Sequence, residues 1–284
     1  MSDVLNVCEI SKKFQNFGLN NVSFNIQENC ITGFIGKNGA GKTTLIKTLL
    51  GLLKKDSGEI AFFSNKYQGN DSLIKNKIGV VLDDGFFYEH LTLNEMKNLI
   101  ASCYSYWNEG KYQEYLKKFR LNPKQSISTL SKGMKLKYSL ALALSHGADL
   151  LIMDEPTSGL DPKIRKELMD ILSEFVQEEG KSAFFSTHIT SDLERCADEI
   201  IIIDNGRIIE QAGKDDIIES YRLIKGTLDD LEKIREVPLK MLDQSRYGFT
   251  GITKEFQTIQ SLNSNMVIEK ATLEDIFLTI IGGE

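Results

Sequence analysis

The stretch that decides the fold is "CITGFIGKNGAGKTTLIKTLLG", which runs from Cys30 to Gly51. Its first residues predict a short apolar strand, its middle is a glycine-rich loop, and its last residues predict a helix. The loop fits G-x-x-x-x-G-K-[ST] and lies between a strand and a helix, which is the context that this motif requires. Glycines let successive backbone N–H groups point inward, and the helix adds its positive end. The stretch therefore predicts a cradle for the phosphates of a nucleoside triphosphate.

The side chains of this loop divide the work of holding a triphosphate. We expect Lys42 to reach the β- and γ-phosphates, Thr43 to offer its hydroxyl to Mg²⁺, and Thr44 to contact the α-phosphate. By itself the loop does not distinguish a kinase, a GTPase, a helicase or a transporter. The complete predicted nucleotide-binding loop is Gly36, Lys37, Asn38, Gly39, Ala40, Gly41, Lys42, Thr43 and Thr44.

Short apolar runs, such as Ile78–Leu82 and Ser182–Ser186, alternate with helical patterns along most of the chain. Strands that alternate with helices imply a parallel sheet covered on both faces. We therefore expect an α/β fold, a P-loop NTPase core whose mixed, mainly parallel sheet carries helices on both faces. The pattern from Leu93 to about Leu121 is helical. Because most of residues 85–149 read in this way, we expect an inserted α-helical subdomain there.

The character of the chain changes beyond about Asp215. Helical Ile217–Ile234 gives way to strand-like pieces, and the end, "ATLEDIFLTIIGG", predicts a helix. We expect a nucleotide-binding domain over residues 1–215 and a small C-terminal accessory or regulatory region over residues 216–284. This region could regulate the nucleotide-binding domain, mediate dimerisation or simply cap the domain.

The composition of the chain limits which classes of protein are compatible with it. The 284 residues carry a net charge of −6, which argues against nucleic acid as the main partner because phosphate binders usually present a basic face. The four cysteines are scattered and lack metal-ligand or redox spacing, as expected of reduced thiols in a cytosolic protein. No secretory signal and no run of about 20 apolar residues is visible in the sequence, so we expect that membrane work requires another chain.

A second stretch, "LLIMDEPTSGLD", ends an apolar strand with two carboxylates. We expect Asp154 to hold the Mg²⁺ shell and Glu155, one residue later, to polarise an attacking water as a general base. His188 follows another apolar strand, in "FSTHIT". At the same sheet edge it could hydrogen-bond the γ-phosphate and sense it, although a structural histidine is an equal alternative on position alone.

A third stretch, "TLSKGM", opens a long helix with residues that pack a core poorly. Ser131 is a good N-cap, Lys132 adds charge, and Gly133 permits close backbone approach. Together they predict a second anion-binding helix terminus. Since one nucleotide already has a full cradle, this terminus would serve a nucleotide held by another copy, with two ATP molecules trapped at a two-fold interface. An ordinary capped helix is the alternative.

The order of these motifs resembles the nucleotide-binding subunit of ABC (ATP-binding cassette) transporters. "GKNGAGKT" resembles the Walker A loop, "LLIMDE" the Walker B strand, "LSKGM" the signature, "SGLD" the D-loop and His188 the switch histidine. The resemblance covers about Val4 to Gly213. It implies that Phe14, or failing that Phe17, stacks on adenine and that Asp161 reaches across a dimer interface.

The resemblance further implies an ATPase that uses ATP and Mg²⁺. It would dimerise on ATP binding, with a second copy of itself or with a related subunit. The dimer would drive separate transmembrane subunits from the cytoplasmic face of the cell membrane. "LDDG" and "LSKGM" are similar to exporters of antimicrobial or toxic peptides and drugs. Two alternatives stay open: a soluble ABC-type ATPase acting on DNA or ribosomes, and a nucleotide switch without turnover.

Two features of the sequence depart from the family consensus, and a third concerns the expected contact with the membrane subunit. Lys132 and Met134 replace the consensus Gly and Gln of the signature, which points to a branch of bacterial exporters. Asp83 stands where the family has a metal-contacting glutamine, and we expect it to keep the metal role. The aromatic residues Phe86, Phe87 and Tyr88 either form a docking surface for the membrane subunit or pack within the helical subdomain.

Overall fold

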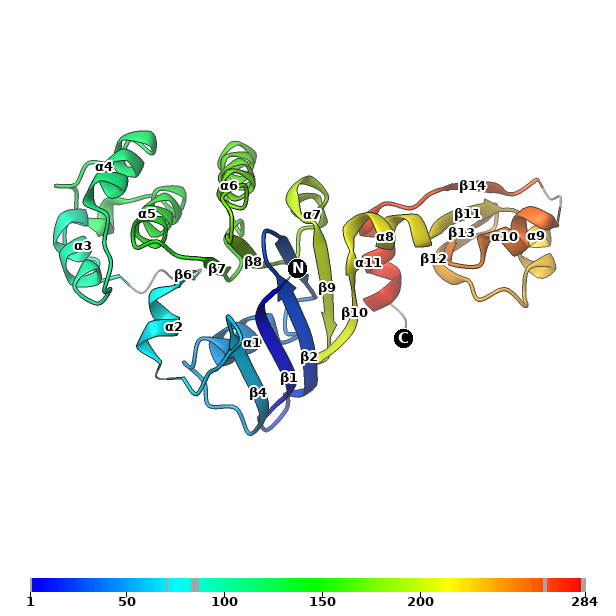
Figure 1. The fold of residues 1–284 in the computed structure, drawn as a ribbon. Coiled ribbons are helices and arrows are strands. Elements are labelled where there is room, and N and C mark those ends of the chain that lie inside the picture. Colours follow the sequence, from blue (N-terminus) through cyan, green and yellow to red (C-terminus); the bar gives the residue numbers. More distant parts are fainter. Residues whose placement is uncertain (1, 70, 83–86, 263–264, 282–284) are drawn as a thin grey trace. The chain divides into compact units, whose positions relative to one another are not determined.

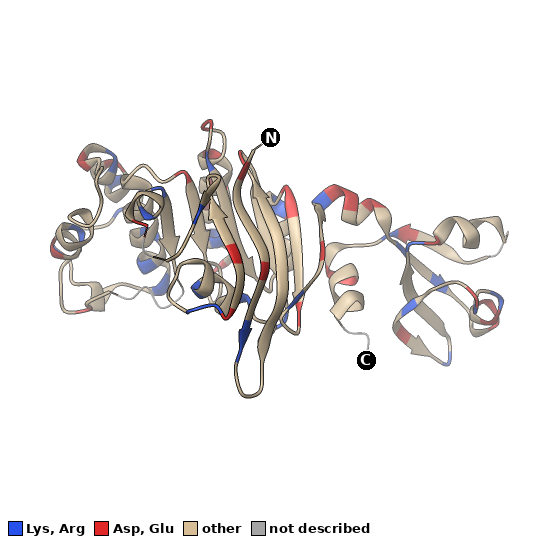
Figure 2. Cartoon of the chain, turned by 60° about the horizontal axis from the view of Figure 1, so that its bottom comes forward, with Lys and Arg blue, Asp and Glu red and all other residues tan. Residues whose placement is uncertain are grey.

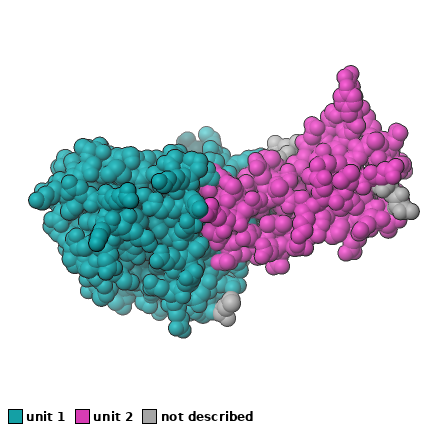
Figure 3. Space-filling view, turned by 90° about the horizontal axis from the view of Figure 1, so that it is seen from above, with its two compact units in different colours: residues 1–188, 199–211 teal, residues 189–198, 212–284 magenta. Residues whose placement is uncertain are grey.

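The computed structural model describes residues 2–69, 71–82, 87–262 and 265–281 (Figure 1). The chain divides into two compact units (Figure 3). The first contains residues 1–188 and 199–211, and the second contains residues 189–198 and 212–284. Residues 189–198 thus belong to the second unit, although they lie within the segment expected to form the nucleotide-binding domain. Asp83 and Phe86 lie outside the described residues.

The centre of the first unit is a six-stranded sheet whose order is β10-β9-β3-β8-β7-β6. The pairs β9–β3, β3–β8, β8–β7 and β7–β6 are all parallel, so the carboxyl ends of these strands share one edge. Every residue of β3, β7 and β8 is buried, which agrees with the mainly apolar sequences of these strands. The strands are β3 (Ile31–Ile35), β6 (Ile78–Val81), β7 (Leu150–Met153), β8 (Ser182–Thr187), β9 (Glu199–Asp204) and β10 (Arg207–Gly213).

A second, antiparallel sheet in the same unit has the order β2-β1-β4-β5. Its apolar side chains and those of the central sheet pack around helix α1 (Lys42–Leu49) in one core, which includes Leu5, Phe34, Leu45 and Phe184. The strands are β1 (Asp3–Lys13), β2 (Gly18–Gln27), β4 (Ser57–Phe62) and β5 (Asn65–Lys66).

In the described part of the helical segment predicted over residues 85–149 there are three α-helices and a 3₁₀ turn. The single helical pattern expected from Leu93 to about Leu121 is divided, because Asn108 caps a new helix by accepting a hydrogen bond from Lys111 N. A capping box of Thr92 and Glu95 fixes the start of the first helix. The elements are α3 (Leu93–Ala101), α4 (Glu109–Lys118), η1 (Ile127–Thr129) and α5 (Lys132–Ser145). Elsewhere in the unit lie α2 (Ser72–Asn76) and α6 (Pro162–Phe175).

The second unit contains a four-stranded antiparallel sheet in the order β12-β13-β11-β14. From β11 to β14 its elements follow the β-α-β-β-α-β sequence of the ferredoxin-like motif. The carboxylate of Glu194 accepts a hydrogen bond from Leu273 N at the start of α11 (3.1 Å). The elements are α7 (Thr190–Cys196), α8 (Lys214–Ser220), β11 (Arg222–Gly226), α9 (Leu228–Lys233), β12 (Lys240–Ser245), β13 (Gly248–Thr253), α10 (Phe256–Ser261), β14 (Val267–Lys270) and α11 (Leu273–Ile281).

Basic and acidic residues are interspersed along the elements of the chain (Figure 2). Many of them form exposed ion pairs, such as Lys66–Glu59 and Lys118–Glu174. Exposed pairs of this kind contribute little to stability. Within the described part of the chain, no helix is both long enough and apolar enough to cross a bilayer.

Candidate functional site

The glycine loop between β3 and α1 has the conformation that a phosphate cradle requires. Gly41 takes a left-handed φ of 112° at the N-cap of α1, and a Cβ there would lie 2.8 Å from the Phe17 ring. A Cβ on Gly36 would lie 2.5 Å from the carbonyl oxygen of Ile203. Only glycine fits these two positions. The loop borders a cavity of about 570 Å³ lined by Asn16, Phe17, Lys37, Asn38, Gly39, Gly41, Lys42, Thr43, Thr44, Glu155 and Asn205.

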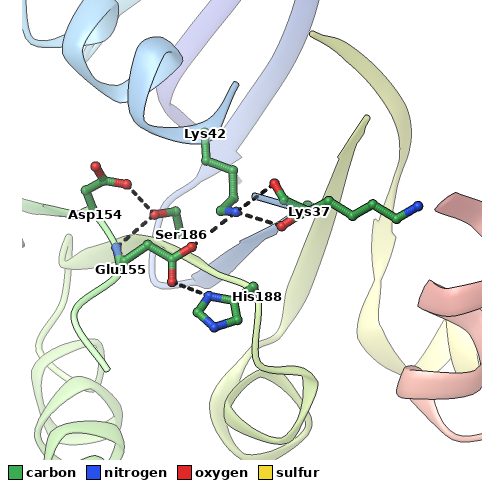
Figure 4. A network of polar contacts seen from close by, with 7 residues as sticks. Lys37, Lys42, Asp154, Glu155, Ser186 and His188 are labelled. Atoms are coloured by element: carbon green, nitrogen blue, oxygen red, sulfur yellow. Dashed lines mark hydrogen bonds and ion pairs between the residues drawn. The ribbon is translucent and has the colours of Figure 1, made fainter. Parts of the chain in front are cut away.

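Lys42 is held inside this cavity by the residues around it (Figure 4). Its side chain is only 5% exposed, and Nζ donates to the carbonyl oxygens of Gly36 (2.6 Å) and Lys37 (3.2 Å). Nζ also lies 3.1 Å from Oε1 of Glu155. The side chain of Lys37 points away from the cluster (Figure 4), so this residue contributes its backbone. The buried ammonium is thus placed among oxygen atoms where an anionic ligand can enter.

The two carboxylates that follow β7 have different environments. Asp154 is buried, and its Oδ1 accepts a hydrogen bond from the hydroxyl of Ser186 on β8 (2.7 Å). The same hydroxyl accepts a hydrogen bond from Glu155 N (2.9 Å). Glu155 has a φ of 47°, in the left-handed region that side chains rarely adopt. Consecutive acids therefore point in different directions, as separate metal-binding and water-activating roles require.

His188, the residue after β8, contacts Glu155 directly. Its Nδ1 lies 2.8 Å from Oε2 of Glu155, and since a carboxylate only accepts, Nδ1–H is the donor. Glu155 therefore lies between Lys42 on one carboxylate oxygen and His188 on the other (Figure 4). The structure thus brings together the three residues predicted to be catalytic. Among the residues that the structure describes, Nε2 of His188 has no hydrogen-bond partner, so it could meet a ligand.

Ser131 caps α5, since its hydroxyl accepts a hydrogen bond from Met134 N (3.3 Å). The signature turn does not line the cavity around Lys42. Gly133 is buried, and a Cβ there would lie 2.3 Å from Cδ1 of Ile164 on α6, so an alanine at this position would require the end of that side chain to move. A Cβ on Gly159 of the "SGLD" turn would lie 3.7 Å from Nζ of Lys132, which places that ammonium beside the turn.

Asp161 caps α6 in the same chain. Its Oδ1 accepts hydrogen bonds from Lys163 N (3.0 Å) and Ile164 N (3.1 Å). The proline that follows at the first helical position suits this start. This side chain therefore has a local role within one protomer, and its contact across an interface stays a prediction.

Comparison with known proteins agrees with this arrangement. The family described as ABC transporter matches residues 19–158. The bacitracin transport ATP-binding protein BcrA of Bacillus licheniformis is 30% identical over 100% of this chain and 99% of its own length. This chain belongs to the ATP-binding subunits of ABC transporters. The family and the ATPase activity predicted from the motifs are thereby confirmed.

This ABC ATPase is also similar to a second transport protein and to a solved structure. The lantibiotic transport ATP-binding protein SrtF of Streptococcus pyogenes is 35% identical over 72% of this chain and 89% of its own length. The solved ATP-binding subunit of an ABC transporter is 30% identical, with a TM-score of 0.69 over 76% of this chain and 92% of that chain. The predicted α/β P-loop fold with helices on a mixed sheet is confirmed by this likeness and by the observed topology.

The aromatic residue at the cavity is Phe17. Phe14 is 46% exposed and does not line the cavity, and the two ring centroids lie 6.4 Å apart. Lys12 Nζ lies 5.7 Å from the centroid of the Phe14 ring. The adenine contact stays a prediction, and the geometry favours Phe17, the second choice of the sequence, over Phe14.

The residues of this ABC ATPase fit a magnesium ion that is shared with a nucleotide. No group of three or more His, Cys, Asp or Glu side chains that could hold a metal occurs among the described residues. Asp154 and Thr43 supply a buried carboxylate and a hydroxyl, which are hard oxygen ligands. Mg²⁺ in nucleotide sites typically takes one or two such ligands and completes its shell with phosphate oxygens and water.

Sequence reasoning missed three residues at this site: Ser186, Asn16 and Asn205. Ser186 bridges Asp154 and Glu155, the two acids that follow the neighbouring strand β7. The sequence signal that could have identified it is its position at the end of an apolar strand, two residues before His188. Asn205 lines the cavity from the turn after β9. Nothing in its local sequence pointed there, because that turn reaches the cavity only through strand order.

Proposed function

We propose that this ABC ATPase powers export of an antimicrobial peptide through separate membrane subunits. Relatives named for bacitracin and lantibiotic transport support this cargo class, and the bacitracin relative matches from end to end. Location at the inner face of the cell membrane follows from such partners. The observation that carries the enzymatic part is the contact of Glu155 with both Lys42 and His188.

The contacts of the site suggest how these residues would act on ATP. Lys42 pairs with Glu155 at 3.1 Å, so a γ-phosphate that engages Nζ competes with this carboxylate. Glu155, once released, can accept the proton of an attacking water, and His188 stays close enough to orient the carboxylate. A Mg²⁺ ion held by Thr43 and Asp154 would neutralise charge on the transferred phosphoryl group.

A second nucleotide-binding subunit, most simply a second copy, would complete each site. Ser131 and Lys132 lie at the N-terminus of α5 and outside the cavity of their own chain. The positive end of a 14-residue helix with an added ammonium suits the γ-phosphate of a nucleotide held by the mate. Two copies in two-fold symmetry would use both cradles and both signature turns.

The membrane subunit would dock beside β6. An apolar cavity of about 220 Å³ lies there, lined by Val80, Leu82, Phe87, Ile100, Tyr104, Ser139, Leu142 and Ala143. The Phe87 ring packs 5.2 Å from the buried Tyr138 ring, whereas Tyr88 is 60% exposed. Phe87 would therefore form part of the wall of this docking cavity while it packs within the helical segment, and the exposed ring of Tyr88 is available for a further contact.

The test is Glu155→Gln in the full-length chain, with and without co-expressed membrane subunits. Phosphate release should fall at least 100-fold, because the general base is lost while the cradle stays intact. ATP with Mg²⁺ should then convert the variant to a stable dimer in sedimentation velocity. Lys42→Ala should abolish ATP binding and the dimer together. Undiminished phosphate release by Glu155→Gln would refute the assignment of the base.

A further inference from the structure

We propose that Asn205, oriented by Asp204, selects adenine over guanine in the nucleotide cavity. The inference rests on the proposed function, because it names the base-reading residue of the same site. Asn205 lines the cavity together with Phe17 and the phosphate loop. It is the base, and not the phosphates, that distinguishes ATP from GTP.

The turn that carries Asn205 is fixed between the phosphate loop and the start of β2, the strand that follows Phe17. Gly206 N donates to the carbonyl oxygen of Ala40 in the phosphate loop (2.9 Å), and Asn20 N donates to the carbonyl oxygen of Gly206 (2.9 Å). Gly206 has a φ of 71°, and a Cβ there would lie 1.8 Å from the carbonyl oxygen of Gly18. The turn therefore has no room to shift, and Asn205 stays beside the loop that carries Phe17.

Asp204 fixes which atom of the Asn205 amide can meet a base. Nδ2 of Asn205 donates to Oδ2 of Asp204 (2.9 Å). A carboxylate cannot donate, so rotating the amide by a half turn would lose this bond and bring two oxygen atoms together. Oδ1 of Asn205 has no hydrogen-bond partner in the part of the chain that the structure describes. The side chain is thus held with an acceptor available to the ligand.

An acceptor at this place favours one purine. Adenine carries an amino group at C6, which donates, whereas guanine carries a carbonyl oxygen at C6, which accepts. Stacking on Phe17 does not discriminate between adenine and guanine, because every base has a π face. The preference between the purines then depends on Oδ1 of Asn205, and one neutral hydrogen bond corresponds to about a fivefold preference.

The experiment compares kcat/KM for ATP and for GTP in the full-length protein, with Asn205→Gly and Asp204→Asn. Glycine suits position 205 because the backbone there has a φ of 45°. The wild type should prefer ATP, and the ATP-to-GTP ratio should fall about fivefold in Asn205→Gly because the acceptor is lost. Asp204→Asn keeps the amide but removes its fixed partner, so the ratio should fall in the same direction.

Asn65→Ala is the control, because Asn65 is an exposed asparagine at the start of β5 that does not line the cavity. Its ratio should equal that of the wild type. An unchanged ratio in both Asn205→Gly and Asp204→Asn, or an equal fall in Asn65→Ala, would overturn the inference. Failure of the proposed function is a separate result, namely phosphate release that does not depend on Glu155.

Discussion

Replacing Gly133 by alanine tests whether the signature glycine serves helix packing, phosphate approach or both. The added Cβ would lie 2.3 Å from Cδ1 of Ile164, while Cγ1 and Cγ2 of Ile164 would be 3.6 Å away, in ordinary contact. Overpacking of this kind costs about 1–3 kcal/mol. We expect Gly133→Ala to lower the free energy of unfolding by about 1–2 kcal/mol, because the better helix propensity of alanine offsets part of that cost.

The structure also supplies the compensating change. Ile164→Val removes only the clashing Cδ1 atom and by itself should cost about 1 kcal/mol. In the double variant the alanine methyl fits, so Gly133→Ala should cost nothing further when made in Ile164→Val. The coupling free energy of this cycle should therefore be about 1–2 kcal/mol in favour of the double variant. Guanidinium unfolding of the four proteins, followed by circular dichroism, measures it.

ATP turnover of the same four proteins separates the two roles of the glycine. If packing is the whole reason for Gly133, the double variant regains both its stability and its phosphate release. If the glycine also admits a phosphate of the mate's nucleotide, stability returns and turnover stays low. A coupling free energy near zero would refute the packing argument itself, because the predicted clash would then not exist.

Three further outcomes follow from the site and the core. Ser186→Ala should lower kcat about tenfold with little change in KM, because the hydroxyl positions Asp154 and Glu155. Phe17→Ala should raise KM for ATP roughly tenfold, and Phe14→Ala should raise it less, in steady-state kinetics. Burial lowers the pKa of His146 to about 4. Because the unfolded chain takes up this proton first, the folded state should lose about 2 kcal/mol between pH 7 and pH 5, and this loss should be absent in urea titrations of His146→Gln.

The sequence predicted those parts of the site in which residue type and spacing carry the chemistry. The phosphate loop could be found because its glycines, Lys42 and Thr43 occur at fixed spacing between a strand and a helix. Glu155 could be singled out because it follows a buried strand, and its role as the general base stays a prediction. Phe14 could not be weighed against Phe17, because both lie in one irregular loop and only the structure shows which ring borders the cavity. The break between α3 and α4 was hidden for a related reason, since the cap at Asn108 is a local hydrogen bond within a continuous helical pattern.

Strand order explains the rest of the site. β8 pairs with β3 on one side and with β7 on the other, so it separates the strand before Lys42 from the strand before Glu155. Residues at the end of β8 must therefore lie between the cradle and the acids, and Ser186 and His188 are those residues. Because motif spacing along the chain is the same for any strand order, no reading of the motifs alone yields this placement. The same order makes His188 a neighbour of the carboxylate that Lys42 holds, so a phosphate that draws Lys42 away changes the environment of His188 in one step.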